Sequence, residues 1–226
     1  MEKYVGTACS GVSIATNERA MQILCHPLYL APIPLYAHIC AAEKVFVDTH
    51  TPFTKQTYRN RAIIATESGT QVLTIPVMHN GVQPMRDVRI SEHGYWRHQH
   101  WNAISSAYRK SPFFDYYADD FAHFYEEKDG FLIDFNLRLH ATICSLLGIE
   151  TPVVEATKST LKTAENEIID LRPLATPEAL VRCDMAVLPY YQVFAQRNGF
   201  IGNLSIADLL FNMGPEGLII LSQQRI

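Results

Sequence analysis

The stretch that decides the fold runs from Met21 to Val47, M-Q-I-L-C-H-P-L-Y-L-A-P-I-P-L-Y-A-H-I-C-A-A-E-K-V-F-V. It contains a short apolar run at Ile23 to Cys25, a longer apolar segment at Ile33 to Glu43, and a second short run at Val45 to Val47. Prolines stand at the start of the longer segment, where a helix tolerates them. The stretch therefore predicts strand, helix and strand, as in an α/β or α+β domain.

Further strands are predicted immediately downstream. Residues 59–66 and 71–78 flank a polar, glycine-bearing turn at 67–70, so they predict a hairpin. Residues 85–90 alternate again and predict another strand. We expect one mixed β-sheet built largely from residues 22–90.

The pattern becomes helical after residue 94. Apolar and aromatic residues recur at spacings of three and four, which predicts helices near residues 96–108, 113–124 and 131–146. Gly148 suits the position just after the last of them, where the backbone often takes a positive φ. These helices form the expected helical layer of the domain.

The two ends of the chain have less regular patterns. Residues 1–20 show no sustained period and predict a loosely ordered lead-in, so the folded domain is expected to span 21–226. The Thr/Glu/Asn-rich residues 150–170 predict a surface loop or a short helix. A short helical extension is expected over about 185–226.

Composition limits the classes of function. The 226 residues are 48% hydrophobic, which is enough for one sizeable core. The formal net charge of −4 argues against a nucleic-acid partner. Five cysteines without a C-x-x-C pair predict neither a disulfide framework nor a zinc site, and favour the reducing cytoplasm. No apolar run approaches the roughly 18–20 residues that span a bilayer, so membrane insertion is not expected. The composition points to no particular cofactor or oligomeric state.

Cationic and amide side chains concentrate at Thr54 to Arg61, T-K-Q-T-Y-R-N-R. In an extended chain, one face would carry Lys55, Thr57, Arg59 and Arg61. Such a face suits a carboxylate or phosphate, which Arg can bind bidentately. The alternative is a solvated edge strand, where Lys and Arg discourage aggregation.

Histidines supply candidates for proton transfer. His100 shares a predicted helix face with apolar residues and is either a general base or a buried histidine bonded to backbone. Asp48 and His50 stand two residues apart after a predicted strand, so the carboxylate could orient the imidazole; the alternative is a turn with solvated side chains. His98 diverges from His100 on a helix, so no metal site is predicted.

Five motifs in order make the chain similar to the WbqC-like family of bacterial proteins. The family pattern reads Q-P-x-Y-L-P-W, an aromatic before K-x-x-Y-x-N-R, L-T-x-P-V, W-x-x-x-H-W-x-x-I-x-x-A-Y and D-x-N. The counterparts, which span about residues 22–148, are His26–Leu30, Phe53 with Lys55–Arg61, Leu73–Val77, Trp96–Tyr108 and Asp134–Asn136. His26 replaces the family's glutamine, and Ala31-Pro32 replaces its proline-tryptophan pair. The ligand of this first loop is therefore expected to differ.

The resemblance implies an association with O-antigen and other surface polysaccharide gene clusters. It suggests a transferase that moves an acyl or aminoacyl group to an activated amino sugar. The chemistry of the side chains themselves makes His100, His50 and Asp48 the candidates for proton transfer. The expected partner is an anionic small molecule, such as a nucleotide-linked sugar or an activated acyl donor, bound by Lys55, Tyr58, Arg59, Asn60, Arg61, Tyr29 and His26. The alternative is a non-catalytic binding or scaffold protein of a polysaccharide pathway.

Two further residues of the last motif have expected roles. Buried Asn136 is expected to tie loops together, and Asp134 to pair with an arginine of the cationic segment. The enzyme hypothesis requires that the cationic segment, a histidine and a carboxylate line one concave site.

Overall fold

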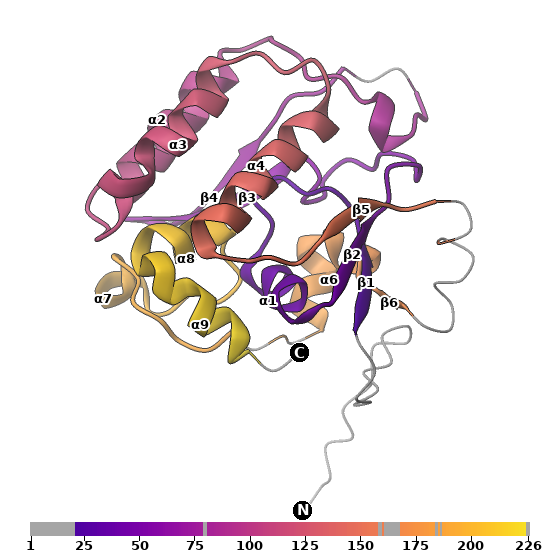
Figure 1. Cartoon of the computed structure of the whole chain (residues 1–226). Helices are drawn as coiled ribbons and strands as arrows, with labels where there is room; N and C mark the ends of the chain where they lie inside the picture. The colour runs from indigo at the N-terminus through magenta and orange to yellow at the C-terminus, as the bar shows by residue number, and fades with distance from the viewer. Residues whose placement is uncertain are drawn as a thin grey trace, which may run out of the picture.

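The computed structural model describes residues 21–78, 81–157, 160, 168–183, 185 and 187–224 (Figure 1). The predicted lead-in, residues 1–20, lies outside this part of the chain.

A four-stranded parallel sheet is built around the opening stretch. Strands β1 (Gln22–Cys25) and β2 (Lys44–Val47) pair in parallel and are joined by helix α1 (Ile33–Ala41). Strand β5 (Val153–Glu155) extends the sheet beyond β2, and β6 (Ile168–Asp170) extends it beyond β1. The strand order is β5-β2-β1-β6, with every pairing parallel.

Three longer helices follow the predicted pattern. They are α2 (Trp96–Tyr108), α3 (Phe114–Glu126) and α4 (Leu132–Leu147). Gly148 ends α4 with a φ of 72°, as predicted for a left-handed C-terminal position. Figure 1 shows α4 crossing the middle of the molecule, with α2 and α3 together on one side.

Alternation along the strands explains how the sheet is covered. Cys25 of β1 and Val45 and Val47 of β2 face α1 and α4, whose side chains join them around a small cavity. Leu24 and Phe46 point to the opposite face and belong to a separate apolar cluster. The sheet is therefore apolar on both faces, as parallel sheets usually are.

The predicted hairpin is confirmed but does not join this sheet. Strands β3 (Arg61–Thr66) and β4 (Gly69–Thr74) pair antiparallel as a two-stranded sheet of their own. Strand β3 packs against α2 and against the C-terminal helix α8 (Ile206–Met213). The expectation of one mixed sheet over residues 22–90 is therefore wrong, because the hairpin packs through β3 on helices instead of pairing with the parallel sheet.

The remaining elements are short. They are η1 (Met85–Asp87), η2 (Arg172–Ala175), α6 (Pro177–Arg182), α7 (Ala195–Asn198), η3 (Gly214–Glu216) and α9 (Gly217–Ser222). Helices α8 and α9 pack against α1 and lie below α4 in Figure 1. The α/β class, the single domain and the C-terminal helical extension are confirmed.

Three local predictions are wrong. Residues 85–90 begin with the 3₁₀ turn η1 instead of a strand, and residues 150–170 contribute β5 and β6 instead of only a loop or helix. Residues 54–60 form successive turns: Gln56 has a φ of 64°, and the Thr57 hydroxyl donates to the Thr54 carbonyl at 3.0 Å. Local side-chain hydrogen bonding thus overrides the alternating pattern.

No helix in the described part of the chain is long and apolar enough to cross a membrane.

Candidate functional site at the carboxyl edge of the parallel sheet

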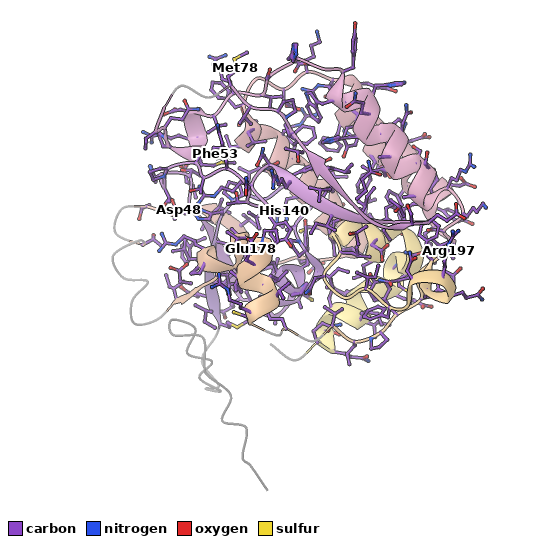
Figure 2. The ribbon with its side chains drawn as sticks, turned by 180° about the vertical axis from the view of Figure 1, so that it is seen from behind. Asp48, Phe53, Met78, His140, Glu178 and Arg197 are labelled. Carbon is purple, nitrogen blue, oxygen red and sulfur yellow. The ribbon has the colours of Figure 1, made fainter. Side chains whose placement is uncertain are left out.

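Polar residues gather where the parallel strands end. His26 follows β1, Asp48 follows β2, Glu155 ends β5 and Asp170 ends β6. Parallel strands bring these ends to one edge of the sheet, which is where open α/β sheets bind ligands. Figure 2 labels Asp48 on the side of the molecule away from Arg197.

Asp48 organises the loop after β2. Its carboxylate, with 0% of the side chain exposed, accepts hydrogen bonds from the backbone N–H groups of His50 at 2.9 Å and Thr51 at 3.0 Å. The Thr51 hydroxyl and Arg172 Nη1, the latter at 2.8 Å, complete the set. Burial by itself raises the pKa of Asp48, but these hydrogen bonds outweigh it and hold the pKa well below its ordinary range.

Arg172 joins two strand ends through this carboxylate. It contacts Asp48 and also donates from Nη2 to Asp170 Oδ2 at 2.7 Å. The hydrogen bonds to Asp170 and Asp48 raise the pKa of Arg172 above its ordinary value. The group is a fixed carboxylate–guanidinium–carboxylate unit with a net charge of about −1.

Arg59 and His26 form a buried pair behind this edge. Arg59 donates from Nη1 to the Pro52 carbonyl at 2.6 Å and from Nη2 to His26 Nε2 at 2.5 Å. Burial, and then the Arg59 charge, lower the pKa of His26 to about 4, so the imidazole is a neutral acceptor. Burial lowers the pKa of Arg59 to about 10, which leaves it charged at pH 7.

Asn136 ties the surrounding loops together, as predicted. Its side-chain N–H groups donate to the carbonyls of Pro27 at 3.2 Å and Arg59 at 2.7 Å. His26 and Asn136 also line a cavity of about 30 Å³, where His26 Nδ1 and Asn136 Oδ1 have no hydrogen-bond partner among the described residues. Such a cavity is large enough for a water molecule.

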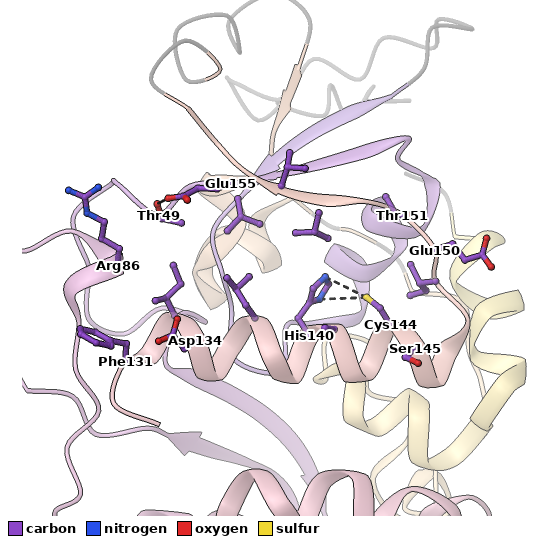
Figure 3. Close-up of a pocket in the computed structure, with 17 residues that line it drawn as sticks. Thr49, Arg86, Phe131, Asp134, His140, Cys144, Ser145, Glu150, Thr151 and Glu155 are labelled. Carbon is purple, nitrogen blue, oxygen red and sulfur yellow. Dashed lines mark hydrogen bonds between the residues drawn. The ribbon is translucent and has the colours of Figure 1, made fainter. Parts of the chain in front are cut away.

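A groove of about 830 Å³ opens along α4 and the sheet edge (Figure 3). Its walls are mostly apolar and come from β2, α4 and β5. Figure 3 shows Arg86, Thr49 and Glu155 at one end, His140 midway along α4, and Cys144 one turn further toward the C-terminal end of that helix.

A cation, an imidazole and a carboxylate meet at the first end of the groove. Arg86 Nη1 donates to His50 Nδ1 at 3.2 Å, and His50 Nε2 lies 3.9 Å from Glu155 Oε1. The Thr49 hydroxyl donates to the same Glu155 oxygen at 2.5 Å. Because guanidinium groups only donate, Nδ1 is the acceptor and the ring proton of a neutral His50 is on Nε2.

The middle of the groove contains a thiol beside an imidazole. Cys144 Sγ lies 3.5 Å from His140 Nε2, and Tyr36 places its hydroxyl 2.9 Å from His140 Nδ1. Burial lowers the pKa of His140 to about 4 and raises the pKa of Cys144 to about 12. Both groups are therefore neutral at pH 7.

Comparison with known proteins shows the family to which the chain belongs. The WbqC-like protein family matches residues 26–179, a span that contains the sheet edge and the groove. The chain belongs to the WbqC-like protein family. It is also 32% identical over 202 residues to the uncharacterized protein Rv1507c of Mycobacterium tuberculosis (strain ATCC 25618 / H37Rv), covering 79% of this chain and 87% of that protein. No solved structure gives a significant match.

The cationic segment of this WbqC-like chain does not form one face. Lys55 is exposed, Arg59 is buried and Arg61 is half-buried at the start of β3. Since the segment is a series of turns, the predicted common face is wrong. Asp134, the expected arginine partner, is exposed on the groove and forms none of the ion pairs among the described residues.

Other predicted binding residues connect loops. The Tyr58 carbonyl accepts from the Tyr29 N–H at 2.8 Å, and Asn60 Nδ2 donates to the Ile75 carbonyl at 2.9 Å. Tyr29 and Tyr58 are buried. Their contacts, like those of His26, are internal to the WbqC-like domain, and a binding role for them stays a prediction.

The predicted catalytic residues His100, Asp48 and His50 do not come together in one site. His100 is buried, with its Nδ1 3.0 Å from the Tyr29 hydroxyl, and burial lowers its pKa to about 4. It lines neither cavity described above. Asp48 bonds the backbone of His50 instead of its ring, so the predicted carboxylate-oriented imidazole is not formed by this pair. His50 does not line the groove either, but it contacts Arg86 and Glu155, which do.

Apart from Asp134, sequence reasoning assigned no role to the residues that line the groove. Arg86 was expected in a strand, and Glu155 was in a segment expected to lack strands. His140 and Cys144 had a usable signal, since residues four apart on a helix share a face. Among the described residues, no group of three or more His, Cys, Asp or Glu could hold a metal ion.

Proposed function

We propose that this WbqC-like protein is a transferase that moves an acyl or aminoacyl group to the amine of an activated amino sugar in bacterial surface polysaccharide synthesis. The observation that carries the proposal is the contact of His50 with both Arg86 and Glu155, two residues that line one end of the groove. These residues supply the cation, histidine and carboxylate that the sequence hypothesis required, although most of the predicted residues are replaced.

The groove has the size and position of a small-molecule site. Its volume of about 830 Å³ lies within the range of about 300–1,000 Å³ that is usual for ligand pockets. Arg86 is half-exposed, with 53% of its side chain accessible, so a phosphate can reach its guanidinium without unfolding the loop. We assign the diphosphate of a nucleotide-linked sugar to this end.

Ligand binding has a direct consequence for His50. In the free protein, Arg86 occupies Nδ1 and the ring proton faces Glu155, so neither nitrogen can accept a proton. A phosphate that draws Arg86 away frees Nδ1. The imidazole then accepts a proton from the attacking amine, and Glu155 stabilises the resulting imidazolium. The anion therefore switches on the base.

A second candidate is a non-catalytic binding protein of the same pathway. It is favoured by the placement of His100 in the core and of Asp48 in a fully hydrogen-bonded unit. In this alternative the groove binds the same anionic sugar without reaction.

A thermal-shift screen with UDP-linked amino sugars and acyl-coenzyme A species tests the binding step. A ligand at about a hundred times its dissociation constant stabilises the native state by about 2.7 kcal/mol. Arg86→Ala should abolish the shift, whereas Arg109→Ala, which removes the same charge from an exposed residue outside the groove, should retain it. No shift with any compound, or an equal shift in Arg86→Ala, contradicts the assignment.

A transfer assay with the stabilising compounds then separates the two candidates. The transferase proposal predicts an amide product that wild type forms and His50→Gln forms about a hundredfold more slowly. Binding without product would favour the non-catalytic alternative.

A further inference from the structure

We propose that Cys144 carries the acyl group as a thioester, with His140 as its general base and Tyr36 as the residue that positions the imidazole. This inference rests on the proposed transferase function and gives it a covalent intermediate. His140 and Cys144 line the same groove as Arg86, so an acyl donor bound there can reach the thiol (Figure 3).

The geometry fits a base and a nucleophile. His140 and Cys144 stand four residues apart on α4 and project toward the sheet, with Sγ 3.5 Å from Nε2. Tyr36 reaches Nδ1 from α1 at 2.9 Å and is itself 1% exposed, so its hydroxyl is fixed. The sulfur also lies 3.8 Å from Nδ1, so it rests against the face of the ring. When Nδ1–H donates to the tyrosine oxygen, Nε2 is the nitrogen left unprotonated and able to accept the thiol proton.

A buried cysteine is ordinarily an inert apolar side chain. Cys144 differs because it borders a large groove and has an imidazole within contact distance. If Cys144 were only an apolar core residue, there would be no need for contacts that run from Tyr36 through His140 to a thiol on the groove. The neutral state of the pair means that the thiol loses its proton to His140 only as it attacks a carbonyl.

The first half-reaction acylates the enzyme. The Cys144 sulfur attacks the carbonyl carbon of an activated donor, a thioester or an acyl phosphate, and the thiol proton passes to His140 Nε2. The new S–C bond forms, the bond from the carbonyl carbon to the leaving thiol or phosphate breaks, and the leaving group takes the proton from His140.

The second half-reaction transfers the acyl group. The amine nitrogen of the sugar attacks the thioester carbonyl, and a C–N bond forms as the S–C bond breaks. The amine proton passes to His50, the base of the proposed transferase, and is exchanged with water, while His140 relays a proton from water to the departing thiolate. Atoms and charge balance without an oxidant or a reductant.

Acid-quenched intact-protein mass spectrometry tests the intermediate. The full-length protein is mixed with short acyl and glycyl thioesters of N-acetylcysteamine and with acetyl phosphate. We expect a mass increase of one acyl group, released by hydroxylamine and located on Cys144 by peptide mapping. Cys144→Ala should lose the adduct, while Cys40→Ala should retain it, because Cys40 is a half-buried cysteine outside the groove.

His140→Gln should slow acylation by about a hundredfold, the usual contribution of general-base catalysis. Thermal unfolding confirms that each variant is folded, and mapping of the wild-type adduct decides the site even if Cys144→Ala unfolds. The inference is overturned by any of three results: no adduct with any probe, an adduct on another residue, or unchanged acylation in His140→Gln.

The thermal-shift screen separates this failure from that of the proposed function. If wild type still gives a thermal shift with a nucleotide sugar that Arg86→Ala loses, the proposed function survives with direct transfer. If that shift is absent too, both fail.

Discussion

Asp48 and Asp208 are both fully buried carboxylates, but their partners are different in kind. Asp48, at the end of β2, bonds a charged guanidinium and two backbone amides, and its pKa stays well below the ordinary range. Asp208, in α8, accepts from the Tyr190 hydroxyl at 2.5 Å and from Gln192 Nε2 at 3.1 Å, which are neutral donors. Burial raises the pKa of Asp208 to about 6.

The difference reflects two roles: Asp48 belongs to the candidate site at the sheet edge, and Asp208 anchors the C-terminal extension. Charge is retained at the sheet edge, where Asp48 holds the loop that carries His50 and where an anionic ligand is expected. In the C-terminal extension the carboxylate fastens the segment around Tyr190 and Gln192 to α8, and Gln192 also donates to the Ile201 carbonyl at 2.8 Å. That anchor rests on hydrogen bonds from neutral donors, and Asp208 loses its charge as the pH falls below about 6.

The largest contrast should come from removing each charge. Asp48→Asn removes a charged partner of Arg172 and weakens the loop after β2. We therefore expect a loss of about 3–5 kcal/mol in the free energy of unfolding. Asp208→Asn keeps an acceptor for Tyr190 and removes a buried charge, so we expect a loss below about 1.5 kcal/mol at pH 7. Urea unfolding measures both. Equal losses would remove the distinction between site and anchor.

The pH dependence of the two variants should differ next. The folded-state pKa of Asp208, about 6, lies above its ordinary value of 3.8, so the native state binds the proton first as the pH falls. Wild type should therefore gain about 2–3 kcal/mol over Asp208→Asn between pH 7 and pH 4. For Asp48 the pKa is lowered, so its advantage over Asp48→Asn is full above pH 4 and declines only below it. Unfolding curves at several pH values measure both differences. A stability difference between wild type and Asp208→Asn that does not change with pH would contradict the raised pKa of Asp208.

Removing one hydroxyl from the anchor should have a smaller effect. Tyr190→Phe deletes the 2.5 Å hydrogen bond to the Asp208 carboxylate and leaves only neutral side chains, those of Gln192, Tyr108 and Asn212, beside it. We expect a loss of about 2 kcal/mol. The pKa of Asp208 should rise further, because a donor that favours its charged form is gone. Urea unfolding gives the free energy, and the pH profile gives the shift.

The matched change at the sheet edge should have the smallest effect. Thr51→Val deletes the hydroxyl that donates to Asp48, but Arg172 and two backbone amides still hold that carboxylate. We expect a loss of about 1 kcal/mol by urea unfolding. A loss larger than that of Tyr190→Phe would show that the charged unit is the less redundant of the two.

Much of the fold was predictable because its longer elements carry enough residues to show a period. Helices α2, α3 and α4, the stop at Gly148 and the β3–β4 hairpin all follow the pattern. Strands β5 and β6 have only 3 residues each, too few for a period. Their partners are also distant in the sequence, since Val153 pairs with Val45. Such pairing is a property of the tertiary fold.

The site was less predictable than the fold. Thr54–Arg61 alternates in sequence, yet a local hydrogen bond and the positive φ of Gln56 turn the chain and bury Arg59. The groove combines η1, the loop after β2, α4 and β5, and no single segment contains more than part of it. His50 was predicted from its place after a strand with Asp48 as its carboxylate, whereas the structure places its ring beside Glu155.

Hydrogen exchange with and without a UDP-linked amino sugar tests most directly whether the groove is the ligand site. The account predicts slower exchange in residues 47–51, in β5 and along α4 of wild type, and no such change in Arg86→Ala. Slower exchange confined to residues 54–61 or to α2, with the groove segments unchanged, would contradict it and return the site to the segments around Lys55 and His100.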